Sequence, residues 1–140
     1  MIILIFFIIH WYSSLFFQTF FHHRYAAHRM FTMNKCWEKI CFILSYITQG
    51  SSYLSPYAYG LLHRMHHAYT DTPNDPHSPT YDGNLFKMMW KTKNIYHDIF
   101  TDQVNIPKKF YGNLPEWRSF DRFAHHWGSR LLFIFVYLLA

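Results

Sequence analysis

Charge is missing from both ends of this 140-residue chain. Residues 1–21 (MIILIFFIIHWYSSLFFQTFF) and residues 131–140 (LLFIFVYLLA) contain no Asp, Glu, Lys or Arg. All 13 Lys and Arg and all 8 Asp and Glu lie between Arg24 and Arg130. The mean hydropathy of -0.11 therefore hides a strong segregation of apolar and polar segments, which is unusual for a soluble domain.

Cysteine is scarce, and no nucleic-acid-binding pattern accompanies the net charge of +5. The two cysteines, Cys36 and Cys41, lack the spacing of a thiolate metal site. We expect both to remain reduced thiols in a cytoplasmic setting. The basic residues come with neither a recognition-helix pattern nor a base-stacking module, so we expect no nucleic acid partner.

The N-terminal apolar segment has the length of a membrane span. A bilayer's hydrocarbon core takes about 20 apolar residues as a helix, so residues 1–21 predict a transmembrane helix. Nothing basic precedes this run, which argues against a cleaved signal peptide. Residues 129–140 predict the start of another transmembrane helix, because their apolar run is too short to cross alone.

Basic residues give the expected orientation in the membrane. The positive-inside rule predicts that residues 22–130 lie on the cytoplasmic side. The cations that flank the two apolar segments are Arg24, Arg29, Lys35, Lys39, Arg118, Arg122 and Arg130.

The polar middle of the chain predicts further helices. Residues 36–60 are apolar only over 40–47, which favours an interfacial or re-entrant helix over a full span. Residues 70–84 have the Pro, Asp and Gly content of ordered turns, and residues 85–100 show the spacing of an amphipathic helix. The chain therefore predicts an all-α membrane protein whose cytoplasmic helical cap occupies residues 61–128.

The strongest chemical signal is the second histidine motif, which comprises His63, His66 and His67. Positions i, i+3 and i+4 share one face of a helix, so three imidazoles are expected to point to one place. Neutral imidazole is a ligand suited to iron, zinc and copper. A surface patch of histidines is the alternative, and we favour a metal site.

The first histidine motif, His23-x4-His28, lies in a connector over residues 22–35. On an ideal α-helix this spacing places the two side chains about 140° apart. They would then bracket an extended site, or the helix would have to open. His22 is interpreted as a flanking residue and not as a ligand.

Together the two motifs resemble a known family. HRYAAHRMF (23–31) and HRMHHAYTDTPNDPHSP (63–79) are similar to the first and second histidine boxes of the membrane acyl-CoA desaturases. GNLPEW (112–117) also fits bacterial members of that family.

This resemblance implies a non-haem centre of two iron ions that activates O2 and removes two hydrogens from an acyl chain. By the same resemblance, the metal ligands are His23, His28, His63, His66 and His67. Asp71 and Asp75 would order an imidazole or simply cap turns. His77 would act in the second shell or in ordering.

The resemblance also implies a fatty acyl-CoA substrate, contact with membrane lipid, and an electron donor such as cytochrome b5 or ferredoxin. Candidate contacts for the CoA phosphates are Arg24, Arg64, Lys91 and Lys93, each of which has an ordinary positive-inside charge as its alternative explanation. Residues 49–59 are expected to line part of an acyl tunnel.

A third HxxHH motif, which the family has, is missing from this chain. His125 and His126 lack the preceding histidine of such a motif and are interpreted as interfacial. Five ligands do not complete two iron sites, so we expect an incomplete desaturase that is inactive alone. The alternatives are a membrane di-iron hydroxylase of alkanes, sterols or carotenoids, and a non-enzymatic metal-binding protein.

Overall fold

The uncharged N-terminal segment forms helix α1 (Ile2–Phe17), which continues without a break into η1 (Gln18–Ala27), a stretch of π-helix. The computed structural model describes residues 1–139, and within that range it contains helices and no strands. Residues Ile3–Ala27 form the one described helix that is long and apolar enough to cross a membrane. The all-α prediction is confirmed, and the apolar helix ends at Ala27 and not at residue 21.

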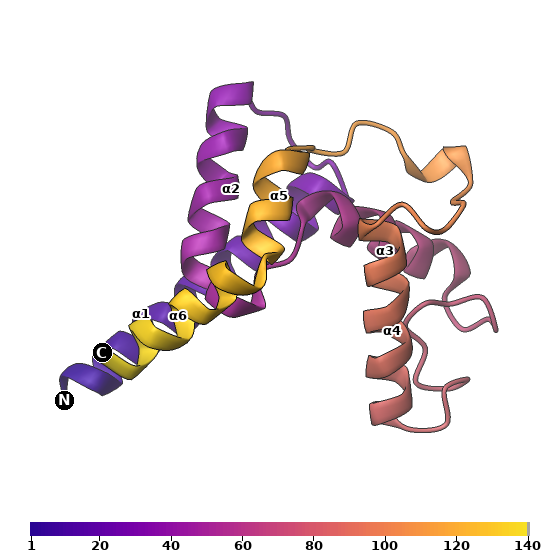
Figure 1. Ribbon diagram of the computed structural model, residues 1–140. Helices are drawn as coiled ribbons and strands as arrows, with labels where there is room; N and C mark the ends of the chain where they lie inside the picture. The colour runs from indigo at the N-terminus through magenta and orange to yellow at the C-terminus, as the bar shows by residue number, and fades with distance from the viewer. Residues whose placement is uncertain (140) are drawn as a thin grey trace.

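Helix α2 (Lys35–Gln49) runs back along α1 (Figure 1). Its start is fixed by Asn34, whose side-chain oxygen accepts a hydrogen bond from the backbone N–H of Trp37 at 3.0 Å. Its end is fixed by Gly50, whose φ of 57° few other residues adopt readily.

After α2 the chain turns through η2 (Gly50–Ser52) and returns towards the histidine end of η1. Gln49 Nε2 donates to Gln18 Oε1 at 3.1 Å, and the carbonyl of Leu54 lies 2.8 Å from Nε2 of His22. The segment over 36–60 therefore leaves and rejoins the same end of the N-terminal helix, which brings both histidine motifs together.

Helix α3 (Pro56–Tyr69) carries the second histidine motif and packs against η1. Ser55 caps it, and proline occupies its first turn, where a missing N–H costs nothing. A series of turns leads to α4 (Leu85–Phe100), which Asn84 caps by accepting from the N–H of Lys87 at 2.9 Å. The amphipathic helix predicted over 85–100 is confirmed.

The chain returns to α1 through three further helical segments. His10 Nε2 and the hydroxyl of Tyr137 lie 3.3 Å apart, and Figure 1 shows α6 beside α1 with both chain ends at one corner. The described part of α6 is apolar but shorter than a span. The segments are η3 (Lys108–Phe110), α5 (Arg118–His125) and α6 (Trp127–Leu139).

Two apolar clusters hold the histidine-bearing elements. One joins α3 to α4 and the 106–110 segment, and it includes Leu61, Ile99 and Phe110. The other packs Phe21 of η1 against Phe42 of α2. Each of the two histidine-bearing elements is therefore anchored by an apolar cluster of its own.

Candidate metal centre

Four imidazoles from two distant segments converge at the junction of η1 and α3. Their ligand atoms all lie within 4.8 Å of one another, and we call His23, His28, His63 and His67 the four-histidine cluster. Nε2 of His63 lies 3.1 Å from Nε2 of His28 and 3.0 Å from Nε2 of His67.

The π-helical turn explains how the first histidine motif contributes both of its rings. The backbone N–H of His28 donates to the carbonyl of His23 at 3.0 Å, which is an i→i+5 bond. With this wider turn, residues five apart come to the same side, and the two ring centroids are 4.5 Å apart. The 140° separation expected for an ideal α-helix therefore does not apply here.

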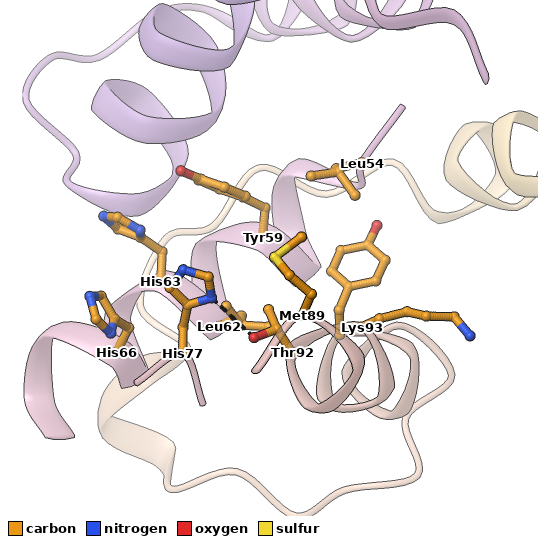
Figure 2. Close-up of a pocket in the computed structure, with 10 residues that line it drawn as sticks. Leu54, Tyr59, Leu62, His63, His66, His77, Met89, Thr92 and Lys93 are labelled. Carbon is orange, nitrogen blue, oxygen red and sulfur yellow. Dashed lines mark hydrogen bonds between the residues drawn. The ribbon is translucent and has the colours of Figure 1, made fainter. Parts of the chain in front are cut away.

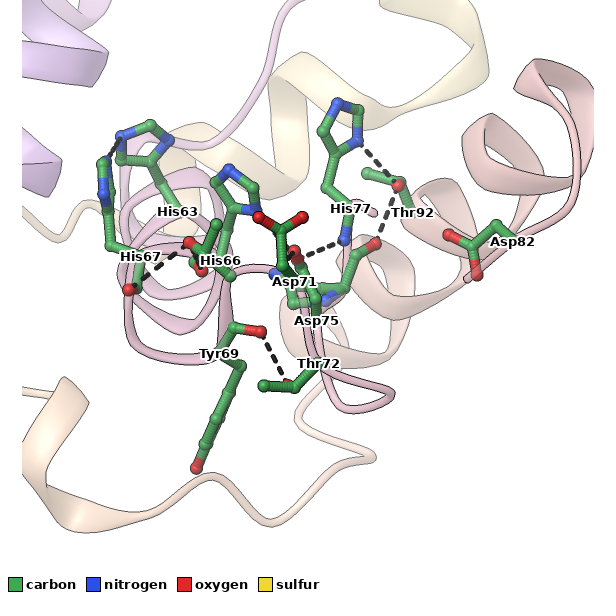
Figure 3. Close-up of polar contacts among 12 residues, drawn as sticks. His63, His66, His67, Tyr69, Asp71, Thr72, Asp75, His77, Asp82 and Thr92 are labelled. Carbon is green, nitrogen blue, oxygen red and sulfur yellow. Dashed lines mark hydrogen bonds and ion pairs between the residues drawn. The ribbon is translucent and has the colours of Figure 1, made fainter. Parts of the chain in front are cut away.

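The second histidine motif divides into two environments. His63 and His67, four residues apart on α3, face the first motif, whereas His66 lies outside the four-histidine cluster. Nδ1 of His66 donates to Oδ1 of Asp75 at 2.8 Å, and Figure 3 shows this side chain beside the Asp-Pro-His loop. The five predicted ligands thus lie close together but do not surround one point.

Asp75 is the partner that fixes His66. Burial alone would raise the pKa of this carboxyl group, but hydrogen bonds from His66 and from the N–H of His77 hold the pKa below its usual value. The ionised carboxylate fixes Nδ1–H of His66 and leaves Nε2 with its lone pair, the usual arrangement behind a metal ligand. Asp71 contributes only its backbone N–H, which donates to Asp75 at 3.3 Å.

His77, the other predicted ordering residue, is held by α4. Its Nδ1 lies 3.0 Å from the hydroxyl of Thr92, which in turn donates to the carbonyl of Pro76 at 2.9 Å (Figure 3). The His66 and His77 ring centroids are 5.8 Å apart. The Asp-Pro-His loop therefore places an imidazole next to the second histidine motif.

Close packing of α3 on η1 depends on Gly60. A Cβ atom built at Gly60 would lie 3.3 Å from the carbonyl oxygen of Ala26 and 2.6 Å from a methyl group of Leu114. This glycine, three residues before His63, was not singled out in the sequence, although a glycine inside a helix is a signal of close approach.

Arg64 joins the same elements through its guanidinium group. It donates to the carbonyls of Ala26, Ala27, Phe110 and Gly112, all at 2.8 Å. These bonds use four of the five guanidinium N–H groups, so in this structure Arg64 stabilises the site. Its contact with a CoA phosphate stays a prediction.

The other predicted phosphate contacts differ in availability. Nζ of Lys91 donates to Asp82 at 2.8 Å and to the carbonyl of Asp75 at 2.9 Å. Arg24 is exposed, and Nζ of Lys93 lies 4.1 Å from the ring centroid of Trp90. Among the described contacts, Arg24 and Lys93 thus have neither an ion pair nor a side-chain hydrogen bond, whereas Arg64 and Lys91 are engaged.

Burial and mutual proximity lower the pKa of two rings of the cluster, His28 and His63. Burial, and then the neighbouring histidines, lower the pKa of His63 to about 3. Desolvation, followed by His23 and His67, also lowers the pKa of His28. At neutral pH His28 and His63 are therefore uncharged, and each ring has one nitrogen lone pair that a metal ion can bind.

The geometry fits a metal ion. Two nitrogens that each lie about 2.1 Å from an ion in adjacent positions are about 3–3.4 Å apart, and the shortest Nε2 separations here are 3.0 and 3.1 Å. An all-imidazole set suits iron, zinc or copper.

Two histidines outside the motifs are structural. His22 is fully buried, with its Nε2 2.8 Å from the carbonyl of Leu54. The Nδ1 of His125 donates to the carbonyl of Asp121 at 2.8 Å, and its Nε2 lies 2.9 Å from the hydroxyl of Tyr96. His126 is exposed.

A cavity of about 480 Å³ lies between α3 and α4, next to the second histidine motif (Figure 2). His63, His66 and His77 contribute imidazoles to its wall, and apolar side chains such as Leu62 and Met89 line another part. Tyr59 stacks on His63 with ring centroids 5.5 Å apart. Leu54 and Tyr59 come from the segment that was expected to line a tunnel.

Comparison with known proteins identifies two relatives. The chain is 37% identical over 73 residues to the Delta-9 desaturase-like 5 protein of Arabidopsis thaliana, a match that covers 51% of this chain and 23% of that protein. It is 42% identical over 57 residues to the Hex-5-enoyl-[acyl-carrier protein] acetylenase of Moorena producens (strain JHB). This second match covers 41% of the chain and 17% of the relative.

No protein-family model and no solved structure matches the chain. The matched segments span less than a quarter of either relative. Within those segments, both similarities support a relationship of this chain to the fatty acid desaturases.

Proposed function

We propose that this chain provides part of the metal centre of an O2-dependent, iron-using desaturase that introduces a cis double bond into a fatty acyl chain. The observation that carries the proposal is the convergence of the first and second histidine motifs in the four-histidine cluster. The two desaturase-related relatives point to the same class of reaction.

Two iron ions are the cofactors of this proposal. The four-histidine cluster would hold one ion, and His66, oriented by Asp75, would serve the second. Iron held by imidazoles and open to O2 supplies the oxidising power that removal of hydrogen from an unactivated C–H bond requires.

In this proposal the residues of this chain would hold the metal ions, orient their histidine ligands and enclose part of the acyl chain. The low pKa values of His28 and His63 keep their lone pairs free for a metal at neutral pH. The cavity between α3 and α4 would receive part of the acyl chain, since its wall combines apolar side chains with His63 and His66.

The substrate would carry its acyl group as a thioester, on CoA or on an acyl carrier protein. Arg24 and Lys93 remain the candidates for its anionic head group, because Arg64 and Lys91 are engaged within the protein. Cytochrome b5 or a ferredoxin would supply electrons. The α1–η1 helix would cross the membrane with both histidine motifs on the cytoplasmic side.

Product analysis tests the proposal. The full-length gene that contains the sequence of this chain would be expressed in a bacterial host, and acyl products formed from added acyl-CoA and acyl-carrier-protein substrates would be analysed by mass spectrometry. A new double bond that is lost in His63→Ala supports the proposal. An alcohol product would favour a hydroxylase, and stoichiometric zinc without O2 consumption would favour a non-enzymatic metal-binding protein.

A further inference from the structure

The N-terminal half of α4 exposes an aromatic and apolar surface. We call Leu85, Phe86, Met89 and Trp90 the α4 outer face; their side chains are 64%, 85%, 55% and 63% exposed. Phe86 and Trp90 are four residues apart and so lie on one side of the helix. Large contiguous apolar patches on a protein surface mark sites of contact with another protein, a ligand or a membrane.

The two halves of α4 differ in their partners. Ile99 is buried in the core formed with α3, and Ile95, Tyr96 and Phe100 pack against that core. In the N-terminal half, Met88 is the one buried side chain. The helix is thus fixed at its C-terminal end and extends its first turns away from the core.

Charge on this helix has one sign near the α4 outer face. Lys87, Lys91 and Lys93 lie among its first nine residues, and the first acidic residue of the helix is Asp98. Lys91 is paired with Asp82, whereas Lys93 lies over the ring of Trp90. Aromatic residues beside lysines are the composition of helices that rest in the headgroup region of anionic membranes.

The N-terminal ends of α4 and α1 lie on the same side of the η1–α3 junction (Figure 1). In Figure 1 the N-terminal ends of α4 and α1 both lie at the lower edge of the molecule, and the junction of η1 and α3 lies above them. If α1 crosses a bilayer, the start of α4 is therefore the end of that helix nearer to the bilayer.

We propose that the α4 outer face inserts into the headgroup region of an anionic phospholipid bilayer. Phe86 and Trp90 enter the boundary between headgroups and acyl chains, and Lys87 and Lys93 contact lipid phosphates. Met89 and Lys93 also line the cavity next to the histidines. If the proposed function holds, an acyl chain enters that cavity from the lipid side of α4.

Depth measurements in nanodiscs test the proposal without iron or activity. The full chain, with Cys36→Ser and Cys41→Ala, would carry a nitroxide at Phe86→Cys or, as a matched control, at Asn94→Cys in the same helix. The rate at which the nitroxide collides with O2, which concentrates in lipid, would be compared with its rate of collision with a water-soluble nickel complex. In phosphatidylglycerol-containing nanodiscs we expect the nitroxide at position 86 to collide several-fold more often with O2 than with nickel. At position 94 we expect collisions with nickel to be the more frequent.

A charge reversal separates electrostatic from purely apolar contact. Lys87→Glu combined with Lys93→Glu should lower the O2 preference at position 86 several-fold in anionic nanodiscs and leave it unchanged in phosphatidylcholine. Equal nickel access at positions 86 and 94 would overturn the proposal, because the face would then be in water. Protection from both reagents would also overturn it, since another protein surface would cover the face.

Discussion

Seven of the eleven histidines occupy three kinds of environment at the scale of single residues. Four converge in the four-histidine cluster, His66 is held by Asp75, and His22 and His125 are held by backbone carbonyls. Spacing in the sequence identifies the first group well. It does not separate a ligand from a neighbouring structural histidine, because that distinction depends on what each ring nitrogen meets in the folded chain.

His63 and His66 should differ when the metal affinity of this chain is measured. Replacing His63 with Ala removes the central ring of the cluster, whose Nε2 lies near those of His28 and His67. We expect the affinity for Co2+, followed by its visible absorption bands, to fall at least about 100-fold. His66→Ala should change it less than about 5-fold. Equal losses would mean that all three residues of the motif serve one ion.

His22→Ala should lower stability even though His22 is no ligand. The substitution leaves a cavity and removes the partner of the Leu54 carbonyl. We expect a loss of about 2–4 kcal/mol in the free energy of unfolding. Denaturant unfolding in detergent measures it, with the exposed His97→Ala as the control. A His22→Ala protein as stable as its control would contradict the buried position.

At the scale of elements, the contact between η1 and α3 brings the two histidine motifs together. Gly60→Val would place side-chain atoms against the Ala26 carbonyl, which belongs to the backbone and has little freedom to move. We expect the two elements to separate and Co2+ affinity to fall at least about 10-fold, although no ligand has changed.

Gly112→Ala is the matched control for the Gly60 variant. A Cβ atom at Gly112 meets only a terminal nitrogen of Arg29, at 3.8 Å. Its Co2+ affinity and its helical circular dichroism should match those of the parent. If Gly60→Val binds Co2+ as tightly as Gly112→Ala, the close approach of α3 to η1 is not what assembles the site.

The contact of α5 with α4 should make stability depend on pH. Burial lowers the pKa of His125 to about 4, whereas the unfolded chain keeps a value of about 6.5. The unfolded state therefore binds more protons between these values, and stability is lost as pH falls through this window. From pH 7.5 to 5, we expect about 2 kcal/mol of loss from this residue.

His125→Gln isolates that contribution. Glutamine retains a donor and an acceptor for Asp121 and Tyr96 but does not titrate. The fall in unfolding free energy between pH 7.5 and pH 5 should therefore be smaller in the variant by about 2 kcal/mol. A parallel pH dependence in both proteins would show that His125 is not held neutral in the fold.

At the scale of the whole molecule, the sequence predicts much of the architecture. Uncharged runs mark the apolar helices, and the helix over 85–100 follows from its periodicity; its cap at Asn84 comes from the structure. Two features are not readable from local patterns. The π-helical turn over Gln18–Ala27 replaces the expected α geometry, and the bonds of Arg64 to four carbonyls depend on segments far apart in the chain.

The whole-molecule account depends on one claim, that the two histidine motifs hold the same metal ion. X-ray absorption of the chain loaded with one Fe2+ tests it by counting imidazoles around the iron. We expect about four histidine nitrogens near 2.1 Å, and fewer in both His28→Ala and His67→Ala. A spectrum that changes in His67→Ala but not in His28→Ala would contradict the account, because the first motif would then lie apart from the metal.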